Sequence, residues 1–198
     1  MDTLIDRLPA PAARPARGQA ASPAPQELPP GRAHPTVKCV GVVGLGRMGE
    51  AFAANLLAAG YHIIAYDRDQ RRAQPLQAEG ARGAEHLADL AASDLVISSL
   101  PDDAALQAVT LGSDGLIGIL RPGAVHVSMS TISPELSRQL AGAHAARGQD
   151  FVAAPVLGNP DAARARLLFV LAGGAPEAVA RVRPVLERLG QRVFVIGN

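Results

Sequence analysis

A turn with three glycines in six positions separates an apolar run from a helix-like run. The segment reads VVGLGRMGEAFAANLLAAGY over residues 42–61, with Gly44, Gly46 and Gly49 at the turn. Glycine weakens an ordinary helix start, so these positions indicate a tight turn and close approach of other groups to the backbone. A strand before such a turn and a helix after it are typical of a dinucleotide-binding fingerprint. The helix-start amides are then expected to face a pyrophosphate.

Strand-like and helix-like runs alternate from residue 38 onward. Strands are expected at residues 38–45, 62–67, 81–84, 94–100, 124–129, 150–156, 167–173 and 192–197, with helices between most of them. One of these helices is interrupted by Pro75, and another is opened by Ser133 as N-cap with Pro134 in its first turn. Continuous apolar strands between helices indicate a sheet buried on both faces. The predicted fold class is α/β, a doubly wound parallel sheet of the Rossmann type.

Composition sets the outer limits of this interpretation. Residues 1–36 are crowded with Pro, Ala and Arg and predict a disordered tail, leaving residues 37–198 as a dinucleotide-binding domain. A transit peptide is the alternative for the tail, although its acidic residues and many prolines count against it. The net charge of +1 and the lack of a long apolar run give no reason to expect a nucleic-acid or membrane partner. Cys39, the only cysteine, is expected in the core of a cytoplasmic protein.

An acidic residue ends the second expected strand. Asp67 follows Gly44 by 23 residues, where a carboxylate accepts hydrogen bonds from the adenosine ribose and repels a 2′-phosphate. This favours NAD, while Arg68 beside it could stack on the adenine or pair with a 2′-phosphate, which keeps NADP open. A simple turn residue at the strand end is the alternative for Asp67. Leu45, Arg47 and Met48 complete the turn; the last two would lie over the phosphates, or else only cover the helix start.

Several motifs in order resemble the β-hydroxyacid dehydrogenase family, which includes 3-hydroxyisobutyrate dehydrogenase and, more distantly, 6-phosphogluconate dehydrogenase and imine reductases. They are VGLGRMGEAFAANLLAAGY, SSLPDDAALQAV, GLIGILRPGAVHVSMSTISPE, FVAAPVLGNPDAA and LLFVLAGG, which together span about residues 38–198. The resemblance implies that Leu100 and Pro101 border the cofactor and that Thr131 contacts its nicotinamide side. The expected crevice of an open parallel sheet lies at these same strand ends.

One motif departs from the family pattern. The segment AAPVLG aligns with Asp-Ala-Pro-Val-Ser-Gly-Gly, whose serine and glycine help to hold the substrate carboxylate. The corresponding substrate-binding positions here are Pro155, Val156, Leu157, Gly158 and Asn159. Leucine offers no hydrogen bond, so a bulkier or less polar substrate is one inference. Asn159 is either a polar contact or a turn residue before a proline.

The catalytic group of the resembling enzymes has no counterpart in this sequence. Their lysine, a general acid/base, lies on the helix that follows the last strand, and we expect it beyond Asn198, with the family's C-terminal helical domain and most of the dimer contact. The only lysine, Lys38, precedes the first strand. His34, His62, His86, His126 and His144 are expected to be hydrogen-bonded or solvent-facing, and no spacing indicates a metal site. An apolar exposed face is expected near residues 185–198.

Three functional hypotheses follow. The first is the NAD(P)-binding part of an oxidoreductase that moves hydride between a nicotinamide cofactor and a 3-hydroxy acid or related carbonyl compound, inactive as this chain alone and a homodimer at full length. The second is a non-catalytic NAD(P)-sensing module. The third is a reductase of imines or larger carbonyl compounds on the same fold.

Overall fold

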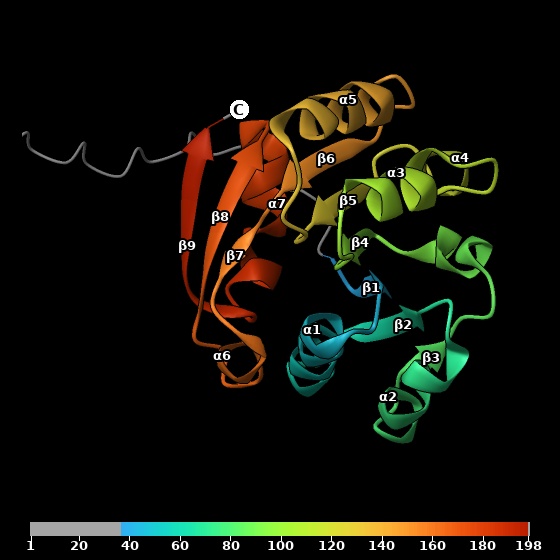
Figure 1. The fold of residues 1–198 in the computed structure, drawn as a ribbon, viewed down its shortest axis with the longest axis vertical. Coiled ribbons are helices and arrows are strands. Elements are labelled where there is room, and N and C mark those ends of the chain that lie inside the picture. The colour runs from blue at the N-terminus through green and yellow to red at the C-terminus, as the bar shows by residue number, and fades with distance from the viewer. Residues whose placement is uncertain (1–36, 198) are drawn as a thin grey trace, which may run out of the picture. The chain divides into compact units, whose positions relative to one another are not determined.

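A nine-stranded sheet organises the chain in the computed structural model, which describes residues 37–197 (Figure 1). The expected tail at residues 1–36 lies outside the described residues. The strands are β1 (Cys39–Val43), β2 (His62–Tyr66), β3 (Arg82–Gly83), β4 (Leu95–Ser98), β5 (Val125–Ser128), β6 (Asp150–Ala153), β7 (Val156–Leu157), β8 (Leu168–Gly174) and β9 (Gly190–Gly197). The α-helices are α1 (Arg47–Ala58), α2 (Gln74–Ala78), α3 (Asp103–Leu111), α4 (Leu116–Ile119), α5 (Pro134–Ala145), α6 (Pro160–Arg164) and α7 (Pro176–Leu186). Two 3₁₀ helices, η1 (Gln70–Ala73) and η2 (Leu87–Ala92), complete the series.

The strand order confirms the doubly wound topology. The order is β3-β2-β1-β4-β5-β6-β8-β7, and every pair from β3 to β6 is parallel. The chain therefore winds outward in one direction from β1 to β3 and in the other from β4 to β6. The reversal point lies between β1 and β4, and ligands of such sheets bind beyond the carboxyl ends of these strands.

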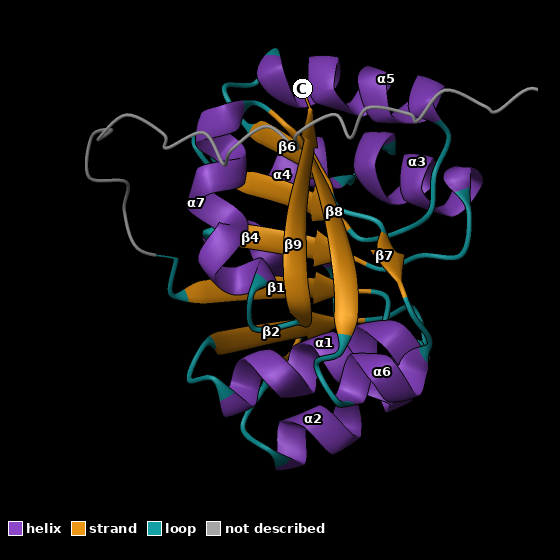
Figure 2. Cartoon of the chain, turned by 90° about the vertical axis from the view of Figure 1, so that its left-hand side faces the viewer, coloured by secondary structure: helices purple, strands orange, loops and turns teal. Residues whose placement is uncertain are grey.

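The last strands depart from the expected parallel arrangement. β8 runs antiparallel to both β6 and β7, while β9 runs parallel to β8. The reason is the short connection, because the chain passes from β7 to β8 through only residues 158–167, which include the five-residue α6. A parallel return needs a crossover of a dozen or more residues. Figure 2 shows β8 and β9 lying across the strands of the parallel part.

Helices cover both faces of the sheet. On one face, α1 and α7 bury side chains such as Phe52, Leu56 and Val182 against Val42 and Ile97 of the strands. On the other face, two smaller apolar clusters join η2 and α4 to β1 and β4, and α3 and α5 to β6. The first helix shows how sequence sets these bounds: Phe52 and Leu56 share one helix face, and Gly60, with φ +87°, follows its end.

Two local predictions have definite outcomes. Ser133 caps α5 by accepting a hydrogen bond from the Leu136 amide at 3.2 Å, with Pro134 at the first helical position, as expected. Cys39 lies in the first strand and packs against one of the smaller apolar clusters, as expected, but at the amino edge of the sheet it is only half-buried. Burial still raises the pKa of the Cys39 thiol.

Candidate dinucleotide-binding site

The glycine turn lies between the end of β1 and the start of α1, at the carboxyl edge of the sheet. Gly44 has φ +86°, and its amide donates to the Tyr66 carbonyl at 2.9 Å. A Cβ at Gly44 would lie 2.4 Å from the Ser99 carbonyl oxygen, and one at Gly49 would lie 1.8 Å from the Gly44 carbonyl oxygen. The chain's own packing therefore requires glycine at both positions.

Gly46 has a different reason to be glycine. Its φ of −65° suits any residue, and the nearest heavy atom to a Cβ built there is Arg72 Nη1, at 3.8 Å. Gly46 is the N-cap of the twelve-residue α1 and supplies no side chain to the amides of the first turn. Because these amides carry the positive end of the helix dipole, the open space above them suits an anion that approaches the backbone.

Asp67 braces the turn from the end of β2. Its Oδ2 accepts from the Leu45 amide at 2.7 Å, and its Oδ1 accepts from the Asp69 amide at 2.9 Å. Each carboxylate oxygen can accept a further hydrogen bond, so a ribose hydroxyl can still be accommodated. Sequence reasoning assigned Asp67 to the ribose, with a turn residue at the strand end as the alternative, and the hydrogen bond from the Asp69 amide shows such a turn contact. The link of Asp67 to Leu45 is a contact that only the fold reveals.

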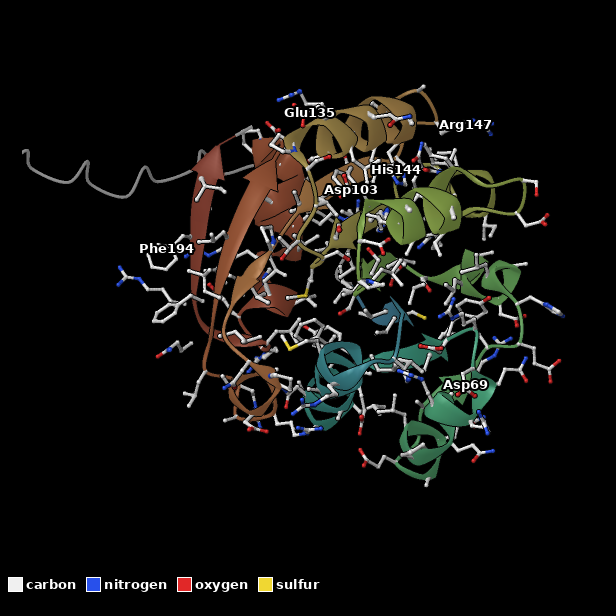
Figure 3. All side chains as sticks on the ribbon, in the orientation of Figure 1. Asp69, Asp103, Glu135, His144, Arg147 and Phe194 are labelled. Carbon is white, nitrogen blue, oxygen red and sulfur yellow. The ribbon has the colours of Figure 1, made fainter. Side chains whose placement is uncertain are left out.

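Arginines surround this side of the turn. Arg47 and Arg68 are exposed, and Arg71 pairs with Asp69 at 2.9 Å; this hydrogen bond holds the pKa of the Asp69 carboxyl below its usual range. Arg72 lies beside Gly46 and is 4.0 Å from Asp69. Sequence reasoning named Arg68 and missed Arg72, although the adjacent pair of arginines after Asp69 was a signal. Figure 3 shows Asp69 near α2, away from β9.

The ends of β4 and β5 meet next to the glycine turn. The Leu100 amide donates to Ser130 Oγ at 2.8 Å, and the Leu100 side chain would lie 2.9 Å from a Cβ at Gly44. Pro101 and Thr131 are exposed just beyond these strand ends. The fold thus gathers the expected cofactor residues from four separate segments, which follow β1, β2, β4 and β5, at one edge of the sheet.

The expected substrate residues follow β6 on the same side of the sheet. Pro155 and Val156 are half-buried, whereas Leu157 is 58% exposed and lies opposite the exposed Phe169 of β8. Gly158 has φ +144°, and Asn159 caps α6 by accepting from the Ala162 amide at 2.9 Å. Of its two expected roles, the structure therefore shows the turn role of Asn159. Figure 2 shows β7 at the side where β1 and β4 end.

The structure also shows where the histidines and the apolar residues near the end of the chain lie. His126 and His144 are buried and hydrogen-bonded, whereas His62 and His86 are exposed; His34 lies outside the described residues. Within residues 37–197, no group of three or more His, Cys, Asp or Glu side chains could hold a metal ion. In the same part of the chain, no helix is long and apolar enough to cross a membrane. Phe194, Val195 and Ile196 form the exposed apolar face expected near the end of the chain.

Comparison with known proteins agrees with this geometry. The family model of the NAD binding domain of 6-phosphogluconate dehydrogenase matches residues 39–197. The chain belongs to this family. It is 45% identical over 161 residues to the uncharacterised oxidoreductase YfjR of Bacillus subtilis, covering 80% of this chain and 56% of that protein. It is 38% identical over 160 residues to 3-hydroxyisobutyrate dehydrogenase of Pseudomonas aeruginosa, covering 80% and 54%.

A solved structure extends the likeness to three dimensions. The structure of Psf3 in complex with NADP+ and 2-OPP has a TM-score of 0.78 and 33% identity, over 80% of this chain and 57% of that one. The present chain therefore spans about half the length of the curated relatives it matches. Family membership assigns the NAD-binding fold to residues 39–197.

Proposed function

We propose that residues 37–198 act as the dinucleotide-binding domain of a cytoplasmic oxidoreductase that transfers hydride between NAD(P) and a small 3-hydroxy acid or related carbonyl compound. The observation that carries the proposal is the open space at Gly46. Neighbouring glycines are required by the protein's own packing, whereas a Cβ at Gly46 would lie no closer than 3.8 Å to any heavy atom outside its two chain neighbours. Glycine there is explained by a diphosphate that approaches the backbone amides of α1.

Different residues around the turn would contact different parts of the coenzyme. The amides of Gly46, Arg47 and Met48 would receive the diphosphate, and Asp67 would accept from the adenosine ribose while it holds Leu45. Leu100, Pro101 and Thr131 would border the nicotinamide half. The bound coenzyme supplies the hydride acceptor or donor, and the protein's task is to orient it and to exclude water.

Both coenzymes have a partner on the adenosine side. The remaining lone pairs of Asp67 favour the ribose hydroxyls of NAD, whereas Arg68 and Arg72 offer guanidinium groups to a 2′-phosphate. We expect NAD to bind and NADP to be accepted through Arg72. The preference between them is set by these two opposing charges.

The substrate region favours a compound with an apolar group. Leu157 presents a leucine side chain where the resembling enzymes hold a carboxylate, and Asn159 is engaged in capping α6. Since neither side chain is free to bind a carboxylate, an imine or a larger carbonyl compound is the second candidate substrate class. The full-length protein is expected to act as a homodimer.

The proton donor for hydride transfer is expected outside this chain. Lys38 precedes β1 and lies at the amino edge of the sheet, opposite the glycine turn. The 198-residue chain should therefore bind coenzyme without turnover. A purely NAD(P)-sensing module would behave in the same way, so the two hypotheses separate only in the whole gene product.

Calorimetric titration with NADH and with NADPH tests the binding proposal. We expect saturable binding with one coenzyme per chain, and absence of binding by a folded chain would contradict the proposal. Turnover of 3-hydroxyisobutyrate and of a cyclic imine by the whole gene product then tests the reaction. Turnover of either substrate excludes the sensing module, whereas coenzyme binding without turnover of any carbonyl or imine substrate supports it.

A further inference from the structure

A chain of four buried polar side chains runs beneath α5. Ser98 Oγ lies 2.9 Å from His126 Nε2, His126 Nδ1 lies 3.0 Å from His144 Nε2, and His144 Nδ1 lies 2.8 Å from Gln149 Oε1. Ser98, His126 and His144 are fully buried, and Gln149 is nearly so. We call these four residues the imidazole chain. Nothing in the proposed coenzyme site uses its two imidazoles.

The direction of every hydrogen bond in the imidazole chain is fixed from one end. Gln149 Nε2 donates to the carbonyls of Leu120 at 2.6 Å and Ile117 at 3.2 Å, so its Oε1 is the acceptor for His144. His144 therefore donates through Nδ1 and accepts at Nε2. His126 must then donate through Nδ1 and accept from the Ser98 hydroxyl at Nε2.

This arrangement holds only while both imidazoles are neutral. A proton added to His144 Nε2 would place two N–H groups face to face across 3.0 Å, and a proton added to His126 Nε2 would need the Ser98 hydroxyl to reverse. Burial, and then the neighbouring His144, keep the pKa of His126 well below its ordinary value. Burial also lowers the pKa of His144, against the opposing effects of Gln149 and the Asp150 carboxylate.

Neighbouring elements offer the pair little other charge. β6 contributes Asp150 and the Phe151 ring, which stacks on His144 at 5.7 Å between centroids. β4 contributes the Ser98 hydroxyl, and the end of α4 contributes the two carbonyls. On α5, the carboxylate of Glu135 pairs with Arg138.

The carboxylate that α3 contributes near the pair also has a hydrogen-bond partner elsewhere. Asp103, the first residue of α3, accepts from the Ser133 amide at 3.0 Å. Figure 3 shows His144 beneath α5, with Arg147 beyond it at the end of that helix. Asp150 is therefore the described carboxylate that acts on the pair.

The imidazole chain ends one residue from the support of the glycine turn. Ser98 precedes Ser99, whose carbonyl oxygen would lie 2.4 Å from a Cβ at Gly44 and whose Cβ would lie 3.4 Å from one at Gly49. The Ser98 carbonyl also accepts from the Met129 amide at 2.9 Å. A small movement of this strand end would therefore reach the turn directly, because the interior is close-packed.

We propose that the imidazole chain positions the dinucleotide turn and releases it in acid: neutral His126 holds Ser98 and the end of β4 in place, and proton uptake by the pair loosens them. His126 and His144 are thus positioning residues that act through Ser98. The proposal rests on the proposed function, because its readout is coenzyme affinity. Coenzyme binds the neutral, braced state, so the apparent Kd rises as that state becomes less populated.

Calorimetric titration of the 198-residue chain from pH 7.5 to pH 5.5 tests this, with the coenzyme that binds the wild type. We expect the Kd to rise as pH falls, by at most about tenfold per pH unit for each proton that binding expels. His144→Gln, which cannot titrate, should flatten this profile. Ser98→Ala should also flatten it, while its unfolding stays acid-sensitive because the histidines remain. The matched control His62→Gln, at an exposed histidine, should follow the wild type.

The outcomes distinguish the positioning role of the imidazole chain from coenzyme binding itself. Absence of coenzyme binding at pH 7.5 overturns both the proposed function and the positioning role of the imidazole chain. Binding by the wild type with a Kd that does not change with pH overturns the positioning role alone. If the Kd of His144→Gln or Ser98→Ala rises with falling pH as steeply as that of the wild type, the positioning role is also overturned. If the variants do not fold, ¹⁵N spectra of the wild-type imidazoles decide. Both rings should change from the neutral Nδ1–H form to the imidazolium form over the pH range in which the Kd rises. Rings that stay neutral throughout would overturn the proposal.

Discussion

Gly46→Ser separates the needs of the fold from the needs of the coenzyme. The new Cβ would lie 3.8 Å from its nearest neighbour, Arg72 Nη1, so the protein has room for it. Serine is also a good N-cap and differs from glycine there by only a few tenths of a kcal/mol. The free energy of unfolding should therefore change little. The serine hydroxyl, however, would occupy the space above the α1 amides and accept the hydrogen bonds that we assign to the diphosphate.

The expected loss of affinity follows from those hydrogen bonds. A bond to a charged group contributes about 1.5–3 kcal/mol, so the loss of one or two gives about 3 kcal/mol. This corresponds to about a hundredfold rise in Kd. Calorimetry with NADH or NADPH measures it, and urea unfolding measures the stability.

A matched glycine provides the control for this experiment. Gly142→Ser, at an exposed position of α5 where a Cβ would meet nothing within 4 Å beyond its chain neighbours and the backbone of its own helix, should leave the affinity unchanged. A folded Gly46→Ser protein that binds coenzyme within twofold of the wild type would refute the assignment of the diphosphate to this turn.

Three further predictions concern the same edge of the sheet and the core beneath it. Gly49→Ala should lower the free energy of unfolding by about 1–3 kcal/mol or more, because its Cβ would lie 1.8 Å from a backbone oxygen. An unchanged urea midpoint would contradict this. Arg72→Ala should weaken NADPH binding about tenfold and NADH binding much less, and equal effects on both would argue against a 2′-phosphate contact. Stability should fall as pH drops below about 6.5, because His126 and His144, whose pKa values the fold lowers, take up protons less readily in the folded chain than in the unfolded one. Equal urea midpoints at pH 7.5 and pH 5.5 would show that these histidines do not resist protonation.

The parts of the fold that sequence predicted are those with local causes. The glycine turn, the helix after it and the Ser133 cap follow from backbone freedom and from hydrogen bonds within a few residues. The parallel strands of the first half follow from continuous apolar runs between helices. These features need no knowledge of distant contacts, so the sequence pattern was enough.

The parts that sequence did not predict depend on distant partners. The direction of β8 is not encoded in its apolar run, and the short helices α4 and α6 have too few residues to show a period. Arg72 comes near Gly46 only when β2 and η1 have folded beside the turn. Similarly, His126 and His144 lie on a strand and a helix, and only their packing turns two isolated histidines into one hydrogen-bonded chain.

Backbone amide chemical shifts measured during a coenzyme titration test the central assignment most directly. The ¹⁵N-labelled chain should show its largest saturable shifts at Gly46, Arg47 and Met48, where the diphosphate meets the start of α1. Saturable binding whose shifts gather instead at the opposite edge of the sheet, around Lys38 and His62, would contradict the account.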